Sequence, residues 1–132
     1  MKMRKEKWAD IWGYYGYYQI SNLGRVKSLK RIVKSGKRQK RLVRQRIMRP
    51  FMNTCGYICV ILYKNHKQRC FRVARLVGKY FISNPFNKPE VNHKKGNKKD
   101  NRAWMLEWNT RSENRKHAWG MGLNKGNTRK AA

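Results

Sequence analysis

A long stretch without acidic residues in the middle of the sequence is the feature that most restricts how this chain can fold. Between Asp10 and Glu90 there is no acidic residue, while 19 Lys and Arg fall in that interval. Over all 132 residues, 34 Lys plus Arg stand against 6 Asp plus Glu, which gives a formal net charge of +28. Such a chain repels itself in a compact state unless a polyanion neutralises it. The sequence therefore predicts nucleic acid as the partner.

Other function classes find little support. No run of about 18 apolar residues is present, which argues against a membrane protein. The basic residues 1–7 are followed by Trp8, Ala9 and Asp10 instead of an apolar core, which argues against a secretory leader. We therefore expect a location in the cytoplasm or in an organellar matrix. Three scattered cysteines favour free thiols over disulfides or a cysteine zinc site.

The apolar patterns indicate an α+β fold. Strand-like runs occupy 17–20, 24–29 and 56–63, and residues 70–73 are expected to return as the partner of the last run. From Val73 the apolar residues follow helical spacing, and Asn84-Pro85 limits this helix to 73–82. In the last third we expect a strand over 104–108 and a helix capped by Ser112.

The densest basic stretch runs from Arg25 to Arg49 with twelve Lys and Arg. Within this stretch, the residues from Lys34 to Arg41 lack the regular spacing of apolar side chains that a buried helix or strand needs. We interpret it as a mobile loop or a hairpin tip that orders on a nucleic-acid backbone. The segment 120–132 is expected to be a basic tail.

Residues 8–28 form a distinctive string, WADIWGYYGYYQISNLGRVKS. It resembles the nuclease-associated DNA-binding module at the N-terminus of HNH homing endonucleases from phages and group I introns. The resemblance continues through Gly56-Tyr57, residues 73–77, Phe81-Ile82-x-Asn84-Pro85, residues 92–97, Leu106-Glu107-Trp108 and Ser112-Glu113-Asn114. In this family the nuclease is a β-hairpin followed by a helix that together hold one divalent metal.

The resemblance implies roles for four residues. His93 would be the general base, and Asn92 and Asn114 would hold Mg²⁺ or Mn²⁺ in an active enzyme. His117, one helical turn after Asn114, is a further candidate for metal or phosphate contact. The implied architecture is an N-terminal antiparallel β module, a connecting helix, a C-terminal ββα-metal unit at about 89–119 and the tail. As domains, this corresponds to 1–55, 56–119 and 120–132.

Ten basic residues are predicted to bind the nucleic acid, for which double-stranded DNA is favoured and RNA stays open. They are Arg25, Lys27, Lys37, Arg38, Lys40, Arg41, Arg44, Arg75, Lys94 and Lys98.

Several positions depart from the family pattern. Met105 stands where the family has an asparagine that braces the catalytic loop, and a thioether cannot make those hydrogen bonds. Lys95 replaces a frequent aspartate, Ala74 replaces a histidine, and Asn92 stands where some relatives have aspartate, which leaves neutral oxygen ligands. Two hypotheses therefore stand: a metal-dependent endonuclease that cuts or nicks DNA, or a degenerate HNH scaffold that binds RNA or DNA as a structural subunit, for example of a ribosome.

Overall fold

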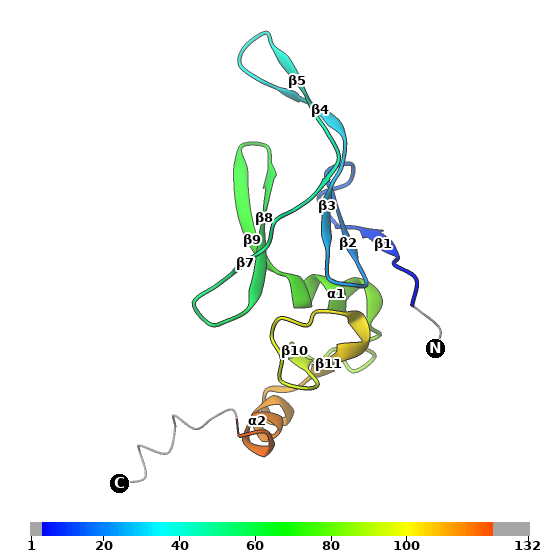
Figure 1. Cartoon of the computed structure of the whole chain (residues 1–132), viewed down its shortest axis with the longest axis vertical. Coiled ribbons are helices and arrows are strands. Elements are labelled where there is room, and N and C mark those ends of the chain that lie inside the picture. Colours follow the sequence, from blue (N-terminus) through cyan, green and yellow to red (C-terminus); the bar gives the residue numbers. More distant parts are fainter. Residues whose placement is uncertain (1–3, 123–132) are drawn as a thin grey trace.

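Helix α1 (Val73–Phe81) lies at the centre of the fold in a computed structural model that describes residues 4–122. Several small antiparallel sheets surround it, and a second helix, α2 (Arg111–Gly120), lies at one end (Figure 1). The mixed α and β composition predicted from the sequence is confirmed.

The N-terminal sheet has four antiparallel strands in the order β1-β2-β3-β6. Their bounds are Trp8–Asp10, Tyr18–Ser21, Val26–Ser28 and Arg46–Ile47. Ile20 and Val26 lie opposite each other across β2 and β3 and are fully buried, so this face of the sheet contributes to the core. The turn between β2 and β3 contains Gly24 at φ +84°, a conformation that glycine adopts without steric cost.

A two-stranded arm projects from this sheet and consists of β4 (Arg31–Lys34) and β5 (Lys40–Val43). Figure 1 shows it at the end of the molecule opposite α2. The two strands pair with each other and with no other described strand. The Ser35 backbone N–H donates to the Gln39 carbonyl at 2.7 Å, which closes the tip. Of the two interpretations of the basic stretch, the hairpin is confirmed.

A third sheet contains β7 (Phe51–Met52), β8 (Ile58–Lys64) and β9 (Lys67–Arg72). Asn65 and His66, both at positive φ, form the two-residue turn between β8 and β9. The return strand therefore begins at Lys67, earlier than the predicted 70, because this tight turn lets pairing start at once. The cysteines are free: Cys59 is buried, and Cys55 and Cys70 are exposed.

The core forms where α1 packs between the sheets. Val73, Leu76 and Val77 of α1 are buried together with Val60 and Leu62 of β8. The indole N–H of Trp108 donates to the carbonyls of Gly78 and Ile82 at 3.3 and 3.2 Å, which ties β11 to the C-terminal end of α1. The predicted helix over 73–82 is thus confirmed to within one residue.

The C-terminal unit consists of β10 (Glu90–His93), β11 (Leu106–Asn109) and α2. The expected strand over 104–108 is wrong in its first half, because Ala103–Met105 form a 3₁₀ turn in which the Met105 N–H donates to the Arg102 carbonyl at 2.9 Å. The expected cap at Ser112 is also wrong. Thr110 caps α2, since its hydroxyl accepts the Glu113 N–H at 3.1 Å and the Glu113 carboxylate accepts the Thr110 N–H.

Both segments 1–55 and 56–119 contribute side chains to the buried core cluster, and the division of the chain at these boundaries stays a prediction. The predicted basic tail lies outside the described residues from 123 onward. Neither helix in residues 4–122 has the length and apolar character needed to cross a membrane.

Candidate active site

His93 ends strand β10 and is buried, with 6% of its surface exposed. Its Nε2 lies 2.8 Å from the amide Oδ1 of Asn101, which is equally buried. An amide oxygen can only accept, so Nε2 carries the hydrogen and Nδ1 keeps a lone pair. The ring of Tyr57 lies against the imidazole at a centroid distance of 6.2 Å. The ring is therefore held in an orientation with one nitrogen able to accept a proton.

The surroundings of His93 favour its neutral form. Burial lowers the pKa of the imidazole below its ordinary value, and the nearby Lys98 ammonium acts in the same direction. The hydrogen bond that His93 donates to Asn101 and the charge of Asp100 oppose this shift without cancelling it. At neutral pH the ring is therefore uncharged, as a general base must be before it accepts a proton.

Asn92 and Asn114 each direct their amide nitrogen to a carboxylate. Asn92 Nδ2 donates to Glu107 Oε1 at 2.9 Å, and Asn114 Nδ2 donates to Glu90 Oε2 at 2.7 Å. These bonds leave both amide oxygens free to bind a ligand. Asn92 and Asn114 line one cavity of about 410 Å³ together with Glu90, His93 and His117.

The donor set of this cavity fits a hard divalent cation. Mg²⁺ and Mn²⁺ prefer oxygen ligands and commonly take part of their shell from substrate phosphates. Within residues 4–122 no group of three or more His, Cys, Asp or Glu side chains is placed to hold an ion. An ion here would therefore depend on the amide oxygens of Asn92 and Asn114, and the carboxylates of Glu90 and Glu107 supply nearby negative charge.

His117 lies on α2 at the edge of the same cavity. Its Nε2 donates to the Lys94 carbonyl at 2.8 Å, which joins the helix to the loop after β10. The structure thus brings together all four residues that the resemblance singled out, His93, Asn92, Asn114 and His117.

The ten predicted nucleic-acid contacts divide into separate groups. Lys98 and Arg75 lie near His93: Lys98 lines the 410 Å³ cavity, and Arg75 lines a smaller one beside it. Lys94 is on the same loop, where its Nζ donates to the Trp104 carbonyl at 3.2 Å. The arm and the residue after it carry exposed cations far from this site in sequence: Lys37, Arg38, Lys40, Arg41 and Arg44.

Arg25 and Lys27 form the remaining group, on the N-terminal sheet beside Trp8. Lys27 Nζ lies 4.0 Å from the centroid of the Trp8 ring. Arg25 Nε donates to Glu6 at 2.9 Å, and this bidentate pair lowers the pKa of the Glu6 carboxyl. Arg25 is thus already paired with a carboxylate.

Four residues of the site were not predicted from the sequence: Tyr57, Glu90, Asn101 and Glu107. Glu90 could have been found, because it precedes Asn92 by two positions in a strand and so shares its face. Asn101 carries no such signal. It reaches His93 across a loop closed by the backbone hydrogen bond from Lys94 N–H to the Met105 carbonyl, at 2.9 Å. Met105 thus contributes its backbone where the family has a side-chain brace.

The N-terminal sheet supports this loop directly. The Ala103 N–H donates to the Asn22 carbonyl at 2.8 Å. A Cβ on Gly24 would lie 2.9 Å from Asn101 Cβ, so the turn between β2 and β3 touches the residue that holds His93. The β2–β3 turn therefore packs directly against the loop between β10 and β11.

Comparisons with known proteins identify several similar sequences. Residues 6–63 match the family model described as the NUMOD4 motif. The chain is 39% identical over 119 residues to an uncharacterised HNH endonuclease of Acanthamoeba polyphaga mimivirus, covering 90% of this chain and 32% of that protein. It is 37% identical over 108 residues to the DNA endonuclease I-HmuI of Bacillus phage SP01, covering 82% of this chain and 55% of that protein.

A solved structure also matches, one that describes DNA binding and cleavage by the HNH homing endonuclease I-HmuI. The TM-score is 0.70 at 34% sequence identity, and the match covers 88% of this chain and 59% of the other. The chain thus spans between about a third and somewhat over half of the length of these relatives. On sequence and fold together, the chain is similar to HNH homing endonucleases, and its residues 6–63 carry the NUMOD4 motif.

Proposed function

We propose that the protein is a divalent-metal-dependent HNH endonuclease that cleaves DNA strands. The observation that carries this proposal is the convergence of His93, Asn92 and Asn114 on one cavity rimmed by cations. The relatives named as DNA endonucleases support DNA as the substrate. Their phage and viral origin supports action inside an infected cell.

In the proposed reaction His93 Nδ1 takes a proton from a water molecule that attacks the scissile phosphorus. The new bond joins the water oxygen to phosphorus, and the bond from phosphorus to one ester oxygen breaks. Asn101 keeps the hydrogen on Nε2, so Nδ1 is free for this transfer. Burial keeps the ring neutral beforehand by lowering its pKa.

Mg²⁺ or Mn²⁺, held by the amide oxygens of Asn92 and Asn114 and by phosphate oxygens, would supply positive charge against the negative charge that develops on the phosphate and the leaving oxygen. Glu107 and Glu90 orient these amides through the hydrogen bonds at 2.9 and 2.7 Å. They also provide the negative charge that an asparagine at position 92 lacks.

The arm is proposed to hold the duplex. A two-stranded β-ribbon fits the major groove of B-DNA, and β4 and β5 form such a ribbon with exposed cations along it. Lys37, Arg38, Lys40, Arg41 and Arg44 would neutralise phosphates, while Arg75, Lys94 and Lys98 would contact the backbone beside the cut. Arg25 and Lys27 would extend this surface along the N-terminal sheet.

The test is incubation of the purified protein with supercoiled plasmid in Mg²⁺ or Mn²⁺, with EDTA and His93→Ala as controls. Nicked circles that need the metal are expected, with a rate about 10²- to 10⁴-fold lower in His93→Ala, the usual contribution of a general base. Tight binding of DNA or RNA by the wild type without any nicking would refute the enzyme and favour the structural nucleic-acid-binding protein.

A further inference from the structure

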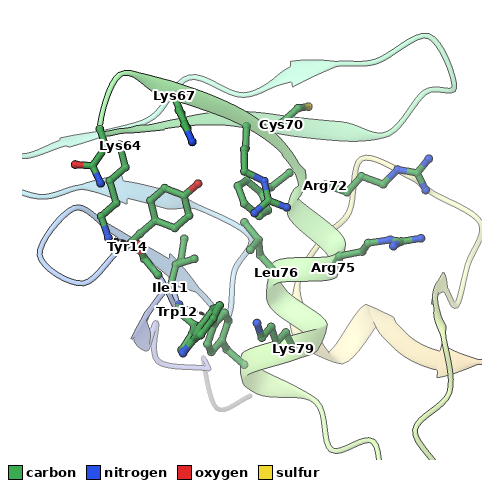
Figure 2. A pocket seen from close by; sticks show the side chains of 15 residues that line it. Ile11, Trp12, Tyr14, Lys64, Lys67, Cys70, Arg72, Arg75, Leu76 and Lys79 are labelled. Atoms are coloured by element: carbon green, nitrogen blue, oxygen red, sulfur yellow. Dashed lines mark hydrogen bonds between the residues drawn. The ribbon is translucent and has the colours of Figure 1, made fainter.

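A larger cavity, of about 870 Å³, lies between the turn after β1, the β8–β9 hairpin and α1 (Figure 2). It is strongly basic, because six of its lining residues are cations and, among the described residues that line it, none is acidic. These cations are Lys64, Lys67, Arg69, Arg72, Arg75 and Lys79. Such a concentration of positive charge around one hollow predicts a ligand with several negative charges.

Hydrogen bonds from the turn hold the walls of this cavity in place. Lys64 Nζ donates to the Gly13 carbonyl at 2.6 Å, which ties the turn to β8. The Trp12 backbone N–H donates to Tyr80 Oη at 2.5 Å, which ties it to α1. Because these bonds connect the walls directly to one another, the cavity does not need a ligand to hold its shape.

Trp12 supplies an aromatic face at the rim. Its side chain is 73% exposed, and in Figure 2 it lies beside Lys79 at the lower edge of the cavity. Lys79 Nζ is 5.7 Å from the centroid of the indole ring. An exposed aromatic ring next to cations is the combination with which proteins bind single-stranded nucleic acid, because the ring stacks on a base while the cations hold the phosphates.

The basic lining continues toward His93. Arg72 and Arg75 line the 870 Å³ cavity and also the small cavity that contains Glu90, His93 and Asn114. In Figure 2 both arginines extend from the α1 side, away from the centre of the larger cavity. A strand whose phosphate lies at His93 can therefore run along these two guanidinium groups into the larger cavity.

We propose that this cavity binds a single-stranded DNA segment adjoining the cleaved phosphodiester, with one base stacked on Trp12. The proposal rests on the proposed function and adds a site to it. The volume falls within the roughly 300–1,000 Å³ of small-ligand sites, which suits a short piece of one strand. A base inside a duplex has both faces covered by its neighbours and offers none to Trp12, so the site selects unpaired nucleotides.

The test is binding of a fluorescein-labelled oligothymidylate in EDTA, where no metal-dependent cleavage can occur. Trp12→Ala is expected to weaken binding about 5- to 150-fold, the loss of one stacked base worth about 1–3 kcal/mol. Trp12→Phe, which keeps an aromatic face, is expected to retain most of the affinity. Tyr15→Ala is the matched control, since Tyr15 is 68% exposed in the same turn but does not line the cavity.

A blunt-ended duplex measured in parallel separates this site from general DNA binding, and its affinity is expected to be the same in Trp12→Ala and the wild type. A 2-aminopurine base in the oligothymidylate should lose fluorescence on stacking, and Trp12→Ala should abolish that quenching. Wild-type affinity of Trp12→Ala for the oligothymidylate, or an equal loss on oligothymidylate and duplex, would overturn the proposal. Neither result depends on nicking, so a failure of the proposed nuclease activity would be recognised separately.

Discussion

Asn101→Ala removes the acceptor that orients the buried ring of His93. Both residues are 6% exposed, so the Nε2 hydrogen would lose its partner in a largely buried place. A buried donor left without a partner costs about 1–3 kcal/mol of stability. The larger effect is expected on cleavage, because nothing would then keep Nδ1 directed at the attacking water, and misplacement of a catalytic group by about 1 Å can cost about 100-fold in rate.

At a suitably high pH, a change in the protonation state of His93 cannot account for a lower cleavage rate of Asn101→Ala. The hydrogen bond with Asn101 raises the pKa of His93, so its removal lowers that pKa further and leaves the ring neutral. We would therefore measure nicking of supercoiled plasmid with enzyme in excess, well above the ordinary histidine pKa of about 6.5. A drop in rate at that pH reports orientation and not charge.

Asn97→Ala is the control for this measurement, because Asn97 is exposed in the same loop and bonds the Lys99 N–H instead of the histidine. It should nick at the wild-type rate. Urea unfolding of both variants shows whether any lost activity comes from lost folding. If Asn101→Ala is folded and nicks as fast as the wild type, Asn101 does not replace the brace that Met105 lacks, and our account of the loop is wrong.

Four further results are expected. Replacing Lys37, Arg38, Lys40 and Arg41 by glutamine should lower the slope of log affinity for DNA against log salt by up to about 3.6, at about 0.9 per phosphate contact, and an unchanged slope would exclude the arm. The nicking rate should be level above the ordinary histidine pKa and fall only at lower pH, because burial depresses the pKa of His93; a fall that begins above neutrality would contradict this. Glu107→Ala should weaken Mn²⁺ binding in calorimetry about 10- to 100-fold by releasing the Asn92 amide, whereas unchanged binding would show that Glu107 does not position it. Thr110→Ala should cost about 0.5–2 kcal/mol in urea unfolding while Ser112→Ala costs little, and the reverse order would reject the observed cap.

The elements that show a clear local pattern of apolar or charged residues were predicted well from the sequence. The helix at 73–82 follows from the spacing of Val73, Leu76 and Val77, all of which are buried against one side of the fold. The arm was found from charge, because a stretch without an apolar period has no place in a core. The four site residues taken from the family motif also lie together around one cavity.

What the sequence did not predict depends on contacts across loops. Asn101 meets His93 only because the loop folds back through the Lys94–Met105 backbone bond. Thr110 caps α2 because β11 ends at Asn109 and the chain turns at once, whereas Ser112 alone looks like an equally good cap. The 870 Å³ cavity joins residues from three segments that no short motif connects.

The close packing of Gly24 on Asn101 has a consequence for where a cut would fall. If this contact were flexible, the loop between β10 and β11 could move relative to the N-terminal sheet and reach several neighbouring phosphates. On the proposed function, the close contact observed here would hold this loop at a fixed distance from the bases that the N-terminal sheet contacts, so the cut would fall a fixed number of nucleotides from them. Gly24→Ala would force the β2–β3 turn and Asn101 apart. The expected result on a sequencing gel is cleavage at several neighbouring positions instead of one, while some cleavage activity remains.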